Sequence, residues 1–234
     1  MSAPDPRALP DGPRLLVVAG PPSSGKTAVI RALVPELADA RHVTYLKVDV
    51  VRTREIEALG RLGWTCRALV DEAACPDQLL FDRLPAELAA LPAGRLTVLE
   101  TAGLCARCAP YVRQGLALAV LEATAGVGSA LKQGPLLTQA DLVVVTHGDR
   151  LAPAERDVYA ATLAAHAPER TLLWFDGLTR VGLPRLARRV GEALAGFAPL
   201  GAEMLEPRSA PPRLYCSLCL GRREIPVDEL GLAC

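Results

Sequence analysis

Residues 15–27 read LLVVAGPPSSGKT, an apolar run followed at once by Gly20-x4-Gly25-Lys26-Thr27. The run predicts a buried strand, and the residues that follow have helical spacing. Glycines allow a tight turn whose N–H groups point inward at phosphate oxygens. The lysine of such a turn reaches the β- and γ-phosphates, and its threonine hydroxyl is a ligand for Mg²⁺. The positive end of the helix dipole faces the same anion. We therefore predict a phosphate-binding loop formed by Gly20, Pro21, Pro22, Ser23, Ser24, Gly25, Lys26 and Thr27.

The composition limits the protein class. A chain of 234 residues predicts one α/β domain with a small appendage. A net charge of +0 offers no electrostatic argument for nucleic acid or an anionic membrane as a partner. No apolar run approaches the ~20 residues that a membrane-spanning helix needs, and the N-terminus lacks the layout of a signal peptide. We expect a cytoplasmic protein that binds neither nucleic acid nor membranes.

Further aliphatic runs alternate with helical patterns along the chain. Such alternation is typical of a doubly wound, mostly parallel α/β sheet covered on both faces. Polar residues end three of the runs, and they should gather with the phosphate loop at the carboxyl edge of the sheet. These residues are Asp49, Glu100 and Asp149. The expected strands are 15–19, a run in 42–50 that ends near 49, 66–70, 95–100, 117–124, 141–149 and 171–175; the expected helices are 26–37, 53–63, pieces within 74–91, 153–166 and 183–197.

The two ends of the chain differ from its middle. Residues 1–13 predict a Pro-rich tail that is disordered or extended, and residues 14–198 form the phosphate-loop domain. Residues 199–234 combine a Pro-rich linker with a tail that carries three cysteines, Cys234 among them without an assigned role. This tail is too short for a core of its own. We expect it to pack on the main domain or on a second subunit, or to be held by metal.

The cysteines are the second informative feature. A cytoplasmic chain with seven of them needs an explanation other than disulfides. Four cysteines form two C-x2-C pairs, which together make a complete thiolate set for zinc or a [4Fe–4S] cluster, within one chain or across a dimer. Structural thiols and a redox dithiol are the alternatives. Cys66 is assigned to the core. The pairs are Cys105-Ala106-Arg107-Cys108 and Cys216-Ser217-Leu218-Cys219.

From about residue 14 to residue 197, the chain resembles the SIMIBI-class P-loop GTPases that mature nickel enzymes, the urease and hydrogenase accessory proteins. The resemblance rests on the order and spacing of GPPSSGKT, KVDVVRTREIEALGRLG, ACPD, VLETAG, ATAGVGSALKQGPLLTQADLVVVTHGDRLAP and DGLTRVGLPRL. It implies that Thr27 and Glu100 hold Mg²⁺. Asp49 matches a mobile switch carboxylate that contacts Mg²⁺ or orients the attacking water, and Lys26 neutralises phosphate charge. For Asp49 and Glu100, a helix cap is the alternative.

Two other family motifs depart from the pattern. The guanine-reading Asn-Lys-x-Asp becomes Thr146-His147-Gly148-Asp149, so Asp149 is retained to pair with guanine and His147 is placed to stack on the purine. A carboxylate that accepts two guanine hydrogen bonds discriminates against adenine, which favours GTP and leaves ATP open. The family's Cys-Pro-His metal motif becomes Cys75-Pro76-Asp77. A carboxylate is a harder ligand than the imidazole it replaces, which weakens the argument for nickel at that site. A small buried hydrophobe is the alternative for Cys75.

The function that the resemblance implies is a GTP-hydrolysing metallochaperone. In this interpretation a homodimer closes on GTP and Mg²⁺, and hydrolysis delivers Ni²⁺, Zn²⁺ or an Fe–S cluster to a client metalloenzyme or its accessory proteins. The candidate ligands of that cargo are Cys75, Cys105, Cys108, Cys216 and Cys219. Two alternatives stay open. One is a small-molecule or nucleotide kinase on the same loop, and the other is a non-enzymatic, metal- or redox-responsive nucleotide-binding module.

Overall fold

A seven-stranded sheet forms the centre of the computed structural model, which describes residues 9, 12–49, 55–70, 83, 86–87, 96–101, 111–201 and 205–208. The strands lie in the order β3-β2-β4-β1-β5-β6-β7 and pair in parallel throughout. Their bounds are β1 Arg14–Ala19, β2 Val43–Asp49, β3 Thr65–Val70, β4 Leu96–Glu100, β5 Leu116–Glu122, β6 Leu142–Thr146 and β7 Thr171–Phe175. The predicted parallel α/β sheet is confirmed.

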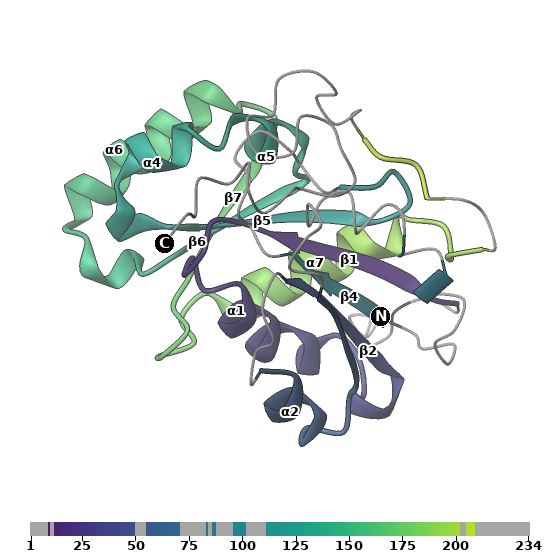
Figure 1. The fold of residues 1–234 in the computed structure, drawn as a ribbon. Helices are drawn as coiled ribbons and strands as arrows, with labels where there is room; N and C mark the ends of the chain where they lie inside the picture. The colour runs from purple at the N-terminus through teal and green to yellow at the C-terminus, as the bar shows by residue number, and fades with distance from the viewer. Residues whose placement is uncertain are drawn as a thin grey trace, which may run out of the picture.

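Helices cover both faces of this sheet (Figure 1). One apolar cluster lies between the sheet and α1, α2 and α7, and a second lies between the sheet and α4, α5 and α6. The aliphatic runs of β1 and β4 are buried along their whole length because both faces are covered. The helices are α1 Lys26–Leu33, α2 Glu55–Gly60, α4 Val127–Leu131, α5 Gly134–Gln139, α6 Pro153–His166 and α7 Leu183–Ala195, with short 3-10 turns η1 Val34–Glu36, η2 Ala40–His42, η3 Ala123–Ala125 and η4 Gly148–Arg150.

The structure differs from the predicted elements in several places. The expected strand 117–124 ends at Glu122 and is followed by η3, and the expected strand 141–149 ends at Thr146 and is followed by η4. The first helix stops at Leu33 and continues as the 3-10 turn η1, whose second residue is Pro35. Helices α4 and α5 have 5 and 6 residues, too few to show a helical period in the sequence. The helical pieces expected within 74–91 lie almost entirely outside the described residues. Within the described part of the chain, no helix combines the length and the apolar character needed to cross a membrane.

Strand register places the carboxyl ends of β1 and β4 side by side. Val18, next to the end of β1, pairs with Glu100, the last residue of β4, and Ala19 pairs with Ala119 of β5 on the other side. In parallel sheets, ligands bind outside the carboxyl ends of the strands. The phosphate loop and Glu100 therefore share one edge of the sheet.

The opposite edge carries a short segment from the C-terminal linker, which we call the C-terminal strap (Leu205–Arg208). Pro207 forms an antiparallel bridge with Val112, and the Arg208 N–H donates to the Tyr111 carbonyl at 2.9 Å. The Arg208 guanidinium donates to both oxygens of Asp141 at 2.8 and 2.7 Å. It also donates to the carbonyls of Val112, Gly115 and Gln139. The described part of the linker is therefore bound to the main domain.

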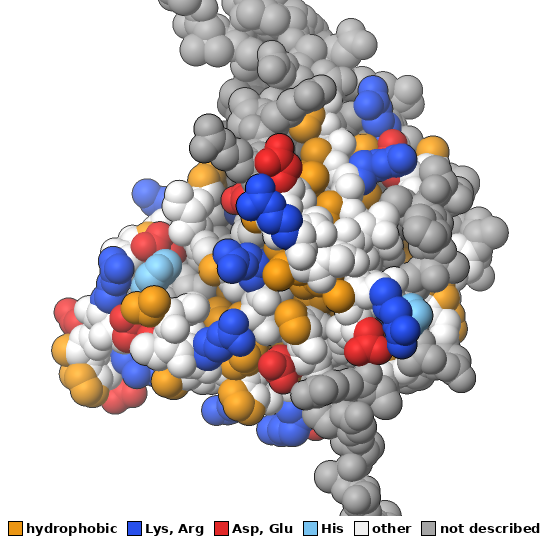
Figure 2. Space-filling model, turned by 90° about the horizontal axis from the view of Figure 1, so that it is seen from below, with side chains coloured by type: hydrophobic (Ala, Val, Ile, Leu, Met, Phe, Trp, Pro, Cys, Tyr) orange, Lys and Arg blue, Asp and Glu red, His pale blue; other side chains and the backbone are white. Residues whose placement is uncertain are grey.

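Charged groups on the face drawn in Figure 2 are mixed in sign. Seen from below the view of Figure 1, basic and acidic side chains lie interspersed (Figure 2). On α7, Arg188 and Arg189 pair with Glu192. This distribution accords with the net charge of +0.

The strap should contribute measurably to stability. We expect Arg208→Ala to lower the free energy of unfolding by about 2 kcal/mol, because it removes a bidentate, partly buried hydrogen-bonded pair. Arg113→Ala is the matched control, since its contact with Glu206 is 3.8 Å long and both side chains are about two-thirds exposed (66% and 68%). Its expected cost is below about 0.5 kcal/mol. Urea unfolding measures both; equal losses would contradict the anchoring role of Arg208.

Candidate functional site

The loop between β1 and α1 has the backbone that its glycines predict. Gly25, directly before α1, has φ +88°, and a Cβ on Gly20 would lie 2.1 Å from the Val120 carbonyl oxygen. Neither position accepts a side chain without strain or a clash. Ser23 between them also has a positive φ, of 61°. The loop therefore makes the tight turn expected of a phosphate-binding loop.

Contacts from inside and outside the loop fix its shape. The buried Lys26 ammonium donates to the carbonyls of Gly20 and Pro21 at 3.0 and 2.9 Å. The Thr146 hydroxyl lies 2.9 Å from the Ser24 carbonyl oxygen and 3.2 Å from that of Leu121. Thr146, which the sequence placed in the base-reading loop, thus joins that loop to the phosphate loop.

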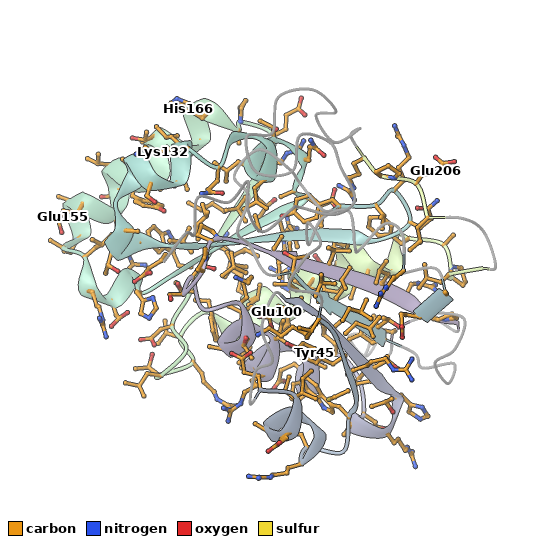
Figure 3. All side chains as sticks on the ribbon, in the orientation of Figure 1. Tyr45, Glu100, Lys132, Glu155, His166 and Glu206 are labelled. Atoms are coloured by element: carbon orange, nitrogen blue, oxygen red, sulfur yellow. The ribbon has the colours of Figure 1, made fainter. Side chains whose placement is uncertain are left out.

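A buried carboxylate lies beside Thr27. The Thr27 hydroxyl is 2.8 and 2.9 Å from the two oxygens of Glu100, which is 2% exposed. The Tyr45 hydroxyl donates to the same carboxylate at 2.8 Å, and Figure 3 shows Tyr45 and Glu100 lying close to each other beside α1. Burial, followed by the charge of Glu100, raises the pKa of Tyr45, which keeps this phenol a donor. Among the described residues, these hydrogen bonds to Glu100 come from side chains.

Two further charged residues complete this cluster. The Lys47 ammonium lies 3.6 Å from Glu100 Oε1 and contacts Glu55 Oε2 at short range. Sequence reasoning did not single out Tyr45, Lys47 or Glu55. The sequence did contain a signal for two of them. Tyr45 and Lys47 are two residues apart in a strand, so they lie on the same face, and both carry a polar group within a buried run.

Two buried hydroxyls near the loop have no hydrogen-bond partner among the described residues, Ser24 Oγ and Thr101 Oγ1. Ser24 belongs to the loop, and Thr101 directly follows Glu100. Buried polar atoms are rarely left unpaired, and an exception indicates a ligand or water. The ammonium of Lys26 suits a phosphate, and hydroxyl and carboxylate oxygens suit Mg²⁺. The residues present therefore fit a nucleotide phosphate together with Mg²⁺.

The base-reading loop lies at the same edge. His147 has a left-handed backbone, with φ 56°, and its Nδ1 is 3.1 Å from the Thr146 hydroxyl and 3.8 Å from Glu122. Asp149 is exposed in η4. A neighbouring loop follows β7, where hydrogen bonds from the Thr179 hydroxyl and from the backbone lower the pKa of Asp176. This edge thus presents His147 and Asp149 without burying either.

Most of the other predicted site residues lie outside the part of the chain that the structure describes. The side chain of Asp49 lies outside the described residues, as do Cys75, Cys105, Cys108, Cys216, Cys219 and Cys234. Cys66 packs partly buried against the apolar cluster under α1 and α7, and burial raises the pKa of its thiol to about 11. That placement agrees with its assignment to the core. Within the described ranges, no three His, Cys, Asp or Glu side chains form a group that could hold a metal ion.

No protein-family model matches the chain, but individual proteins are similar to it in sequence. An uncharacterized protein of Methanocaldococcus jannaschii, MJ0120, is 31% identical over 214 residues, covering 91% of each chain. Urease accessory protein UreG 2 of Streptomyces griseus is 30% identical over 188 residues, covering 73% of this chain and 83% of the relative.

Among solved structures, the hydrogenase maturation factor HypB of Archaeoglobus fulgidus aligns with a TM-score of 0.58 at 18% identity, over 78% of this chain and 91% of HypB. HypB of Helicobacter pylori, solved in complex with nickel, gives 0.57 at 18%, over 77% and 86%. These two matches show the shared fold. The sequence relatives show that the chain belongs to the SIMIBI-class P-loop GTPases and is a distant relative of the nickel-maturation GTPases UreG and HypB.

Proposed function

We propose that this protein binds and hydrolyses GTP with Mg²⁺, and that it couples hydrolysis to delivery of a metal ion or cluster to a client metalloenzyme. The observation that carries the proposal is the contact between the Thr27 hydroxyl and the Glu100 carboxylate beside a phosphate loop. The relatives support the cargo: one is a urease accessory protein, and a structural neighbour was solved with nickel.

The roles of the residues follow from phosphoryl-transfer chemistry. That reaction needs positioning and neutralisation of charge on the transferred phosphoryl group more than covalent catalysis. Lys26 exchanges the carbonyls of Gly20 and Pro21 for phosphate oxygens. Thr27 and Glu100 hold Mg²⁺, which neutralises phosphate charge when bound. Asp49, at the end of β2, is proposed to contact Mg²⁺ or to orient the attacking water.

Base selection is proposed to depend on Asp149. Its carboxylate accepts from the guanine N1–H and amino group, and His147 covers one face of the purine. The same proposal includes a homodimer that forms with GTP bound. Delivery of the cargo needs two conformational states, and GTP must bind one of them more tightly than the other.

A nucleotide assay tests this proposal. We expect the full chain with Mg²⁺ to hydrolyse GTP slowly and to prefer it to ATP, and Lys26→Ala to abolish tight binding. Asp149→Asn should reduce the preference for GTP by at least about 100-fold, because the carboxylate that pairs with guanine is lost. Asp157→Asn, an exposed change on α6, is the control. Equal use of ATP and GTP would contradict the base assignment, and phosphate transfer to an added acceptor in place of water would indicate a kinase.

We further propose that Cys105, Cys108, Cys216 and Cys219 hold Zn²⁺ or a [4Fe–4S] cluster within one chain. The strap supports this connectivity, because it joins the Arg208 N–H to the Tyr111 carbonyl at 2.9 Å. Cys108 is three residues before Tyr111, and Cys216 is eight residues after Arg208. At about 3.5 Å per residue, these tethers reach ~10 and ~28 Å from that hydrogen bond. Both pairs can therefore meet without a second subunit.

Metal analysis of protein purified without oxygen tests the cysteine site. We expect stoichiometric zinc, or iron with sulfide, bound to a nucleotide-free monomer. Cys105→Ser and Cys216→Ser should each remove it because four thiolates are needed, whereas Cys66→Ser, at the core thiol, should retain it. Cys75→Ser with added Ni²⁺ tests the Cys-Pro-Asp motif in parallel. Metal that is found only in dimers would contradict a site within one chain.

A further inference from the structure

The buried ammonium of Lys47 connects two structural elements. Lys47 lies on β2 in register with Glu100 of β4, and it is 5% exposed. Its Nζ lies 3.6 Å from Glu100 Oε1 and contacts Glu55 Oε2. Glu55 is the first residue of α2. A single cation thus bridges the end of a central strand and the start of a helix.

The same two carboxylates surround the Thr27 hydroxyl. Thr27 Oγ1 is 2.8 Å from Glu100 Oε1 and 3.5 Å from Glu55 Oε1. The Glu100 side chain is 3% exposed, whereas that of Glu55 is 41% exposed. A buried carboxylate requires a compensating charge, which Lys47 supplies to Glu100. Glu55 is the partner with room to move, because it borders solvent.

From these contacts we infer that Lys47 is the resident counter-cation of Glu100 in the metal-free protein, that it competes with Mg²⁺ for this carboxylate, and that the exchange links metal occupancy to the position of α2. The inference rests on the proposed function, in which Thr27 and Glu100 hold Mg²⁺. Two cations that share one carboxylate repel each other strongly at this range. Lysine has a flexible four-carbon stem, so its ammonium can leave Glu100 and stay with Glu55. Lys47 is therefore a positioning residue: it couples Mg²⁺ binding at Glu100 to the position of α2 through Glu55.

Removing the charge should make Mg²⁺ bind more easily. In Lys47→Met, we expect the Mg²⁺ concentration that half-saturates fluorescent GDP binding at pH 8 to fall at least about tenfold, because a competing charge is gone. Lys47→Arg, which keeps the charge, and Lys132→Met, directly after α4 at the other face of the sheet, should both match wild type. Should Lys47→Met fail to fold, Glu55→Gln gives the converse test: it removes the Glu55 charge that holds the Lys47 ammonium away from Glu100, and the Mg²⁺ midpoint should rise.

Hydrogen exchange tests the link to α2. Mg²⁺ added to the GDP complex should change the exchange of amides 55–60 in wild type and leave them unchanged in Lys47→Met. A third measurement needs no nucleotide: millimolar Mn²⁺ should raise the melting temperature of Lys47→Met more than that of wild type. An unchanged midpoint, an unchanged α2 response or equal Mn²⁺ stabilisation would each overturn the inference. If wild type binds no guanine nucleotide, but Mn²⁺ still stabilises Lys47→Met more than wild type, the proposed function is refuted and the inference about Lys47 stands.

Discussion

A buried carboxylate at the end of β4 is the constraint on which the site depends. Glu100 is 2% exposed and accepts hydrogen bonds from Tyr45 and Thr27. An ionised group in such a place is costly unless it is paired and hydrogen-bonded. Here β2 supplies the phenol and the ammonium, and α1 supplies the hydroxyl. The carboxylate therefore fixes how β2, β4 and α1 meet at the nucleotide edge.

The opposite edge of the sheet has a comparable charged anchor. Arg208 of the strap pairs with Asp141 at the start of β6, and Asp141 Oδ2 also accepts the Ala117 N–H of β5 at 2.8 Å. One anchor organises the carboxyl ends of the strands and the other their starts. In the sequence, Cys105 and Cys108 lie between Thr101 and Tyr111.

Much of the fold could be predicted from the sequence because aliphatic runs alternate with helical patterns, as strands that are covered on both faces do in a parallel α/β sheet. Helix α6 has the predicted bounds, since a proline and a glutamate mark its first turn. Lys26, Thr27 and Glu100 were found because each ends or follows a recognisable run. The contact between Lys47 and Glu100 was not, because it depends on the register of β2 against β4, which no local pattern states. Glu55 likewise has the sequence signature of an ordinary acidic residue in the first turn of a helix.

The central claim is that Glu100 and Thr27 form the Mg²⁺ side of a nucleotide site. Titration calorimetry with a non-hydrolysable GTP analogue, in the presence and absence of Mg²⁺, tests it directly when wild type is compared with Glu100→Gln. The account predicts that Mg²⁺ tightens binding to wild type at least about tenfold, and that Glu100→Gln loses this gain while it keeps the metal-free affinity, since a neutral amide is a poorer ligand for a hard cation. Equal tightening by Mg²⁺ in both proteins would contradict it.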